Sequence, residues 1–284
     1  MKVRLFGTRG SLAAPGAETA RYGGNTSAAQ VIGPEGTVLA LDAGTGIRAL
    51  GMGLPKTTKR VDVLLTHLHM DHIQGLGFFA PLYNPGMEVH IWGPATRDFD
   101  LRARLTKYLS PPLFPVHFRD LPCKLFLHHA PATAEVGELK ITATLVCHPG
   151  LTVGYRIESR NHVVTYLPDH EPMLGAAEFP KDRSWTSGYD LAEGADLLVH
   201  DCQYTPDEYA ARVGWGHSSF PDAIEFAART GAKHFVPFHH DPSHDDARLD
   251  ELFLEALTRA PRNLLITPAQ EGAVFDLGSQ RERF

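Results

Sequence analysis

The stretch Thr66-His67-Leu68-His69-Met70-Asp71-His72 places four candidate metal ligands within six residues of this 284-residue chain. It follows an apolar run, 61–65, that predicts a buried strand. With 16 His and 18 Asp in the chain, an H-x-H-x-D-H pattern arises by chance about 0.003 times. We therefore interpret the stretch as a metal motif.

The spacing of the motif predicts two metal sites. Alternate residues of an extended segment face the same way, so His67 and His69 can bind one metal ion. The chain then turns into a helix, which would carry Asp71 and His72 to a second ion. Imidazole and carboxylate ligands suit Zn²⁺, Mn²⁺ or Fe²⁺, and the lack of a nearby Cys disfavours a closed structural zinc site.

Composition excludes several classes of protein. Hydrophobic residues make up 43% of the chain and the net charge is -6, which is an ordinary globular balance and argues against extended nucleic-acid binding. No apolar run is long enough to span a bilayer, and the first residues do not resemble a secretory signal. The three cysteines, Cys123, Cys147 and Cys202, form no C-x-x-C pair. We expect buried thiols and a cytoplasmic protein.

The order of expected elements predicts an α+β fold. A strand-rich half, with helices at 46–52, 73–79 and 96–108, is followed by a similar half, with helices at 206–212, 220–230 and 247–259. The expected strands are 3–6, 29–32, 38–41, 61–65 and 88–92 in the first half, and 140–146, 153–158, 163–167, 196–200, 235–237, 263–266 and 272–276 in the second. This order indicates two sheets packed face to face under helical layers, in a single domain over residues 1–284.

The metal motif resembles the signature of the metallo-β-lactamase superfamily. Members have a four-layer αββα sandwich with a two-metal site between the sheets, and the resemblance implies the same here. It also implies further ligands at His148, Asp169 and His239, with the neighbouring His240 as an alternative to His239. The implied set is His67, His69 and His148 for one metal, Asp71, His72 and His239 for the other, and Asp169 between them.

A second segment is similar to ribonuclease Z and its phosphodiesterase relatives. Asp201 ends an apolar run, and Gly216-His217-Ser218-Ser219 opens a helix. The resemblance implies that Asp201 orients His217, which acts as general acid, with Asp71 as a further catalytic residue. A neighbouring carboxylate raises the pKa of a His toward the working pH. The plain alternative is that His217 and Ser218 cap the helix and Asp201 is a turn residue.

Glycine-rich segments near the N-terminus support the same branch. Residues 7–11 and 21–27 resemble the opening of these phosphodiesterases, and 41–46 matches the D-x-G turn beneath the metal loop. Such loops can frame an anion, and an arginine can clamp a phosphate. The substrate-binding candidates are Arg9, Arg21, Asn25, Thr26 and Ser218.

The expected activity is hydrolysis of a small phosphodiester, such as a cyclic nucleotide or a ribosyl cyclic phosphate. A hydroxide held between two divalent metal ions, Zn in first place with Mn or Fe as alternatives, would attack phosphorus.

Only 20 residues separate His148 from Asp169, and they predict a bare hairpin of strands 153–158 and 163–167. Ribonuclease Z generally has a long arm in this part of the chain to grip transfer RNA. His170 stands where relatives usually have Thr or Ser.

Two other functions stay open on the sequence. The same metal pair could hydrolyse a lactone, a thioester or a sulfate ester, and a carbonyl substrate has less need of a separate acid. The chain could also be a non-catalytic metal-binding sensor or assembly protein, although it retains a candidate for all seven ligands. Superfamily relatives are often dimers, so the resemblance favours a homodimer, and the lack of a spanning apolar run predicts no membrane partner.

Overall fold

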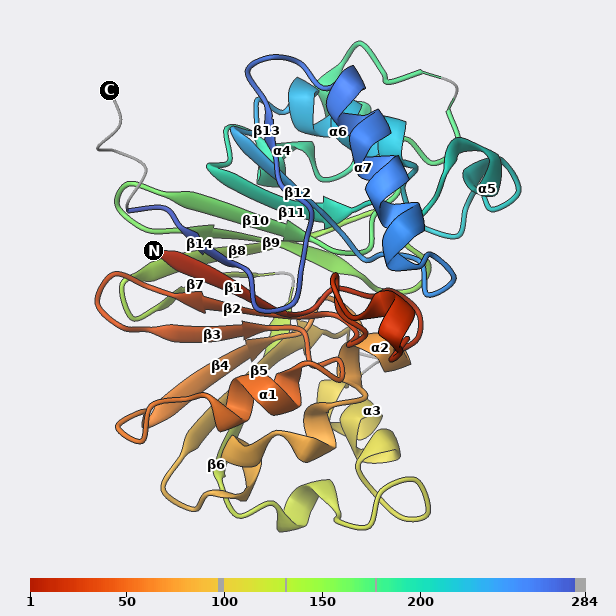
Figure 1. The fold of residues 1–284 in the computed structure, drawn as a ribbon. Helices are drawn as coiled ribbons and strands as arrows, with labels where there is room; N and C mark the ends of the chain where they lie inside the picture. Colours follow the sequence, from red (N-terminus) through yellow and green to blue (C-terminus); the bar gives the residue numbers. More distant parts are fainter. Residues whose placement is uncertain (97–99, 131, 177, 279–284) are drawn as a thin grey trace.

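The computed structural model describes residues 1–96, 100–130, 132–176 and 178–278. Within these residues the chain forms two sheets of seven strands each, packed against each other and covered by helices on their outer faces (Figure 1). The predicted four-layer αββα sandwich is therefore confirmed.

The first sheet has the order β14-β1-β2-β3-β4-β5-β6. Strands β3 to β6 are parallel to one another, and β14, β1 and β2 complete the sheet in antiparallel fashion. Their bounds are β1 (Lys2–Gly7), β2 (Ala28–Ile32), β3 (Val38–Leu41), β4 (Arg60–Leu64), β5 (Glu88–Pro94), β6 (Lys124–Ala130) and β14 (Val274–Asp276).

The second sheet has the order β13-β12-β11-β10-β9-β8-β7. Strands β10 to β13 are parallel, whereas β7, β8 and β9 pair antiparallel. Their bounds are β7 (Ala132–Val136), β8 (Leu139–Leu145), β9 (Val153–Glu158), β10 (Val163–Leu167), β11 (Leu197–Asp201), β12 (His234–Phe238) and β13 (Leu265–Ile266). Strands β9 and β10 form the predicted hairpin with the predicted bounds.

Helices cover the outer face of each sheet (Figure 1). The α-helices are α1 (Ile47–Met52), α2 (Met70–Ile73), α3 (Leu101–Tyr108), α4 (Tyr189–Ala192), α5 (Pro206–Ala210), α6 (Phe220–Arg229) and α7 (Asp246–Arg259). Short 3₁₀ helices are η1 (Ala17–Thr19), η2 (Leu76–Phe78), η3 (Ala80–Tyr83), η4 (Phe118–Asp120) and η5 (Arg183–Trp185). Among the described residues, no helix combines the length and apolar character needed to cross a membrane.

Three buried apolar clusters separate the four layers. The middle cluster lies between the sheets and includes Leu39 from one sheet and Val199 from the other. The second lies under α6 and α7 and contains Phe226 and Phe253, and the third lies under α1 and α3. Alternation along the strands explains this arrangement, because successive side chains point to opposite faces of a sheet. The middle cluster supports the expected single domain, which stays a prediction.

Some expected elements differ from the structure. The helix expected at 73–79 is two short pieces, α2 and η2, because Gly75 and Gly77 interrupt it between tight contacts. The helix expected at 96–108 begins at Leu101, where Asp100 caps it; residues 97–99 lie outside the described residues. Strands β6 and β7 were not expected, because their half-exposed faces carry weak apolar alternation.

The parallel register brings the ends of distant strands together. Strands β3 and β4 in one sheet, and β10, β11 and β12 in the other, end on the side of the sandwich where α2 begins (Figure 1). Open α/β sheets place ligands beyond the carboxyl ends of their strands. A ligand site is therefore expected among the residues that follow these strands.

A buried histidine at the opposite end of β12 makes stability depend on pH. Burial lowers the pKa of His234 from 6.5 to about 4. Between these values the unfolded chain binds more protons than the folded chain, so stability falls as pH falls through this window. From pH 7 to pH 5 this residue should cost roughly 2 kcal/mol of unfolding free energy.

Urea denaturation of wild type and His234→Gln at both pH values checks this expectation. The variant should lose less stability on acidification than the wild type. An equal loss in both proteins would show that His234 does not resist protonation in the folded state.

Candidate metal centre

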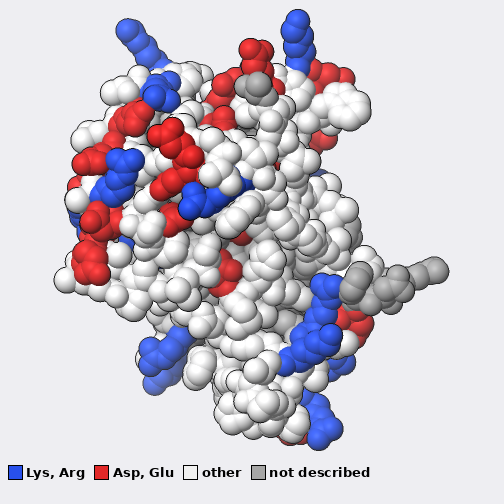
Figure 2. Space-filling model, turned by 90° about the vertical axis from the view of Figure 1, so that its right-hand side faces the viewer, with Lys and Arg blue, Asp and Glu red and all other residues white. Residues whose placement is uncertain are grey.

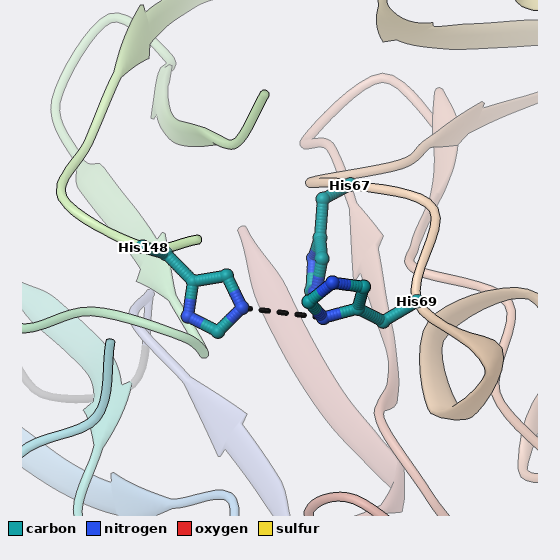
Figure 3. A group of neighbouring side chains, drawn as sticks. All are labelled: His67, His69 and His148. Atoms are coloured by element: carbon teal, nitrogen blue, oxygen red, sulfur yellow. Dashed lines mark hydrogen bonds between the residues drawn. The ribbon is translucent and has the colours of Figure 1, made fainter. Parts of the chain in front are cut away.

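Two groups of potential ligands lie side by side at this end of the sandwich. His67, His69 and His148 form one group, and the nearby ligand atoms of the other belong to Asp71, His72, Asp169 and His239. Within each group one ligand atom of every residue lies within 4.8 Å of the others. Figure 3 shows the first group, in which His148 approaches His67 and His69 from the loop between β8 and β9.

Asp169 lies between the two groups. One carboxylate oxygen, Oδ1, is 2.9 Å from Nε2 of His72 and 3.2 Å from Nε2 of His239. The other, Oδ2, is 3.7 Å from Nε2 of His67 and 3.6 Å from Nε2 of His148. Each oxygen therefore faces a different group, as a bridging carboxylate must.

In the first group, hydrogen bonds to the outer ring nitrogens set the histidine tautomers. Nδ1 of His148 donates to the carbonyl of Gly216 at 2.8 Å, which leaves Nε2 with a lone pair, 3.3 Å from Nδ1 of His69 (Figure 3). Nδ1 of His67 lies 3.1 Å from the hydroxyl of Thr66, which itself bonds to Asp42. Nε2 of His67 is buried without a hydrogen-bond partner.

The second group is organised in the same way. Nδ1 of His72 lies 2.8 Å from Oδ2 of Asp42, and Nδ1 of His239 lies 3.0 Å from Oε1 of Gln203. These acceptors direct both Nε2 atoms inward, where they approach each other to 3.3 Å. A partner on the outer nitrogen is the usual way in which proteins orient a metal-binding imidazole.

The donor set fits divalent cations. Two inward-facing imidazole nitrogens and carboxylate oxygens attract positive charge to the same point. Burial opposes protonation of His72, yet Asp169 and Asp71 raise its pKa well above the usual value. Burial instead holds the pKa of His67 well below its usual value. Nε2 of His67 has no hydrogen-bond partner, and the Nε2 atoms of His72 and His239 face each other. Both features indicate that cations bind between these side chains.

His217 lies beside both groups and is held by Asp201. Its Nδ1 is 2.6 Å from Oδ2 of Asp201, and its ring packs against His148 and His239 with centroids 5.1 Å away in both cases. Burial lowers the pKa of His217, but Asp201 outweighs burial and raises it to about 8. The ring can therefore carry a proton at neutral pH at the edge of the candidate metal centre.

The structure also separates neighbouring histidines that the sequence leaves ambiguous. His239, at φ 62°, joins the second group. His240 turns away and its Nε2 lies 3.1 Å from the carbonyl of Ala269, beside Tyr22 and Phe253. His170 points behind the site and bonds to His200 at 2.9 Å. His240 and His170 therefore contribute to packing around the site and not to the ligand groups.

The expected phosphate clamp of Arg9 and Arg21 is not formed. The Arg9 side chain is fully buried, and its guanidinium donates to the carbonyls of Gly23, Asp241 and His244. Arg21 pairs with Asp250 at 2.7 Å. Both arginines fasten the N-terminal loops to the segment around α7, so we correct their assignment from substrate binding to structural support.

The other substrate-binding candidates also have partners within the protein. Asn25 is held by Glu271, and Thr26 exchanges hydrogen bonds with Thr45. Ser218 donates through its backbone to Asp201 and through its hydroxyl to the carbonyl of His170. Contact of these residues with substrate stays a prediction.

Long-range partners of the candidate ligands carried little sequence signal. Gln203 is buried and links Nδ1 of His239 to the hydroxyl of Ser11, and its backbone bonds to Asp201. The backbone N–H of Ser11 donates to Asp71 at 2.8 Å. Only the D-x-G turn pointed to Asp42, because this pattern was expected beneath the metal loop.

Replacing Asp42 should weaken metal binding while the fold persists. Asp42 has φ 56°, a conformation that asparagine tolerates. In Asp42→Asn an amide oxygen replaces the carboxylate on Nδ1 of His72, and we expect metal affinity to fall about 10- to 100-fold. Competition with a chromophoric chelator measures this affinity. The control is Asp62→Asn, a buried aspartate of β4 that pairs with Arg60 and Trp92, and equal affinities in the two variants would contradict the expectation.

Known proteins resemble this chain over most of its length. The family model for the β-lactamase superfamily domain matches residues 37–240. Ribonuclease Z of Lacticaseibacillus casei is 26% identical, over 84% of this chain and 84% of its own. The solved structure of the metallo-β-lactamase fold protein YhfI from Bacillus subtilis has a TM-score of 0.69 at 21% identity and covers 96% of this chain and 98% of that one.

Two further structures share the fold. The short form of human tRNase Z has a TM-score of 0.66 at 19% identity and covers 98% of this chain and 99% of its own. Zn²⁺-bound PqqB from Methylobacterium extorquens has a TM-score of 0.68 at 21% identity and covers 98% and 100%.

The chain therefore belongs to the β-lactamase superfamily and has the metallo-β-lactamase fold. The similarity to ribonuclease Z confirms the predicted resemblance to the phosphodiesterase branch of that superfamily.

Proposed function

We propose that this protein is a dinuclear metal-dependent phosphodiesterase that hydrolyses a small phosphodiester, with His217 as general acid. Its class, a metal-dependent phosphoric diester hydrolase, is supported by the family match and by the ribonuclease Z relatives. The observation that carries the finer proposal is Asp169, whose two oxygens face two separate ligand groups beside His217.

Seven side chains would hold two divalent cations. His67, His69 and His148 would hold one divalent cation, Asp71, His72 and His239 the other, and Asp169 would contact both. When bound, the cations supply Lewis acidity and a water of lowered pKa. Zinc is the first candidate on the donor set, with manganese or iron as alternatives.

The remaining step is departure of the alcohol, in which His217 would supply a proton. Cleavage of the P–O bond leaves an alkoxide that needs a proton, and a positioned imidazolium can supply it. The carboxylate of Asp201 accepts from Nδ1 and so directs Nε2 of His217 away from itself. Oδ1 of Asp201 accepts from the backbone of Ser218 and Gln203, which holds the carboxylate in place.

The shape and charge of the chain support a small substrate. Strands β9 and β10 join through a short turn, residues 159–162, and carry no arm. The net charge is -6. Figure 2 shows the right-hand side of Figure 1: charged side chains gather at its upper left and top edge, Lys and Arg also lie at its lower left and lower right, and the middle of this face consists mostly of other residues. An extended polyanion needs many Lys and Arg contacts.

Hydrolysis assays test the proposal directly. We expect the chelator-treated protein, reloaded with Zn²⁺, Mn²⁺ or Fe²⁺, to hydrolyse bis(p-nitrophenyl) phosphate and either 2′,3′- or 3′,5′-cyclic nucleotides. A structured precursor transfer RNA should remain intact under the same conditions. If no metal restores turnover of any diester, the proposal is wrong. Lactone hydrolysis that survives in His217→Ala would favour an acyl substrate, and tight metal binding without any hydrolysis would favour a sensor.

A further inference from the structure

Glu171 is a buried carboxylate that lies outside both ligand groups. The residue is 1% exposed. Oε1 accepts from the hydroxyl of Tyr209 at 2.8 Å and from the backbone N–H of Gly214 at 3.0 Å. Oε2 accepts from the N–H of Gly214 at 3.1 Å and of Gly216 at 2.9 Å. All of these partners are donors, so the carboxylate is satisfied as an acceptor alone.

The segment that Glu171 holds, residues 214–216, contacts the candidate metal centre through Gly216 and leads directly into His217. The carbonyl of Gly216 accepts from Nδ1 of His148 and so sets the tautomer of that ligand. A Cβ on Gly216 would lie 2.4 Å from the same nitrogen, so a side chain at this position would collide with the imidazole. The next residue is His217, which bonds to Asp201.

Glu171 is tied to His148 from the other side as well. Its backbone N–H donates to the carbonyl of Cys147 at 2.9 Å, the residue before His148. One residue therefore fixes the backbone before His148, and its side chain fixes the segment that accepts from the His148 ring.

We propose that Glu171 is a positioning residue that orients both the ligand His148 and the acid His217 through its hydrogen bonds to residues 214–216. The half that concerns His217 rests on the proposed function. The part of the proposal that concerns His148 requires only that the protein binds metal, whatever reaction it catalyses. A buried carboxylate is costly unless it is fully hydrogen-bonded, and here each hydrogen bond ends on this segment or on Tyr209.

Removal of the carboxylate should disturb metal affinity and acid catalysis together. In Glu171→Ala the N–H groups of Gly214 and Gly216 lose their acceptor, so the carbonyl of Gly216 shifts against His148. We expect zinc affinity of one of two sites to fall about 10- to 100-fold, the usual effect of losing the partner that orients a metal ligand. We further expect kcat to fall with KM little changed, and the limb of the kcat–pH profile that reports His217 to move.

A conservative variant should rescue most of this loss. In Glu171→Gln the amide oxygen can accept from Gly216 while the amide NH₂ donates to the hydroxyl oxygen of Tyr209. We expect zinc affinity within about threefold of wild type, because the amide oxygen at the Oε2 position still accepts from Gly214 and Gly216 and only the contacts at the Oε1 position change. The double variant Glu171→Gln with Tyr209→Phe removes that acceptor and should fall between Glu171→Gln and Glu171→Ala. It also serves if Glu171→Ala does not fold.

Zinc affinity by chelator competition and the pH profile are the two measurements, with Glu135→Gln on the exposed side of β7 as the matched control. Wild-type zinc affinity and an unmoved pH profile in Glu171→Ala, or in the double variant if only that folds, would overturn the proposal even if stability fell. If the wild type hydrolyses no diester, the proposed function fails, but the zinc titrations still decide whether Glu171 positions His148.

Discussion

Asp169→Asn is expected to abolish most of the metal-dependent hydrolysis of diesters. Oδ1 of Asp169 faces His72 and His239, and Oδ2 faces His67 and His148. Asparagine has one oxygen and can therefore serve one group only. Loss of one cation removes several kcal/mol of transition-state stabilisation, and we expect kcat/KM to fall roughly 10³-fold.

Metal content and kinetics measured on the same preparation check this expectation. Zinc per chain should fall from two toward one in Asp169→Asn. The control is Asp196→Asn, one residue before β11, where the carboxylate pairs with Lys233 on the surface. A variant that keeps two zinc ions and the wild-type rate would show that Asp169 does not join the two groups.

His217→Ala is expected to slow the reaction in a way that depends on the leaving group. A general acid matters most when the departing oxygen is a strong base. For a cyclic nucleotide, which releases a ribose alkoxide, we expect kcat to fall about 10²- to 10⁴-fold. For bis(p-nitrophenyl) phosphate the leaving phenolate needs no proton, and the loss should stay below about tenfold.

The comparison of the two substrates separates catalysis from structure. A merely structural His217 would lower both rates by the same factor, and this outcome would contradict the assignment. Asp201→Asn should show the same substrate dependence in weaker form, because Nδ1 of His217 keeps a neutral partner but loses the charge that holds its proton. Zinc content should match wild type in both variants.

The strand-to-helix form of residues 66–72 and the hairpin were predicted correctly because they are local. Residues 66–72 combine a strand end with a helix start, and the 20 residues between His148 and Asp169 leave no room for more than strands β9 and β10. The helix expected at 73–79 was wrong because close approach at Gly75 and Gly77 outweighs helical spacing. Strands β6 and β7 were not predicted because their exposed faces carry little alternation of apolar and polar residues.

Residues that act through distant partners could not be placed from the sequence. Arg9 and Arg21 look like phosphate ligands in a glycine-rich opening, yet they bind the region around α7, more than 200 positions away. Glu171 and Gln203 belong to no motif. Their partners come from separate strands and loops, and only folding brings these together.

The sequence by itself determined the superfamily, the types of ligand and the likeness to phosphodiesterases, since all three depend on residue identity at short spacing. The tertiary structure decided which of His239 and His240 joins the second group, which ring nitrogens face inward and what holds His217. The physical reason is that tautomer and orientation depend on the second partner of each imidazole. Those partners, Asp42, Gly216, Gln203 and Asp201, reach the site through strand register and loop packing.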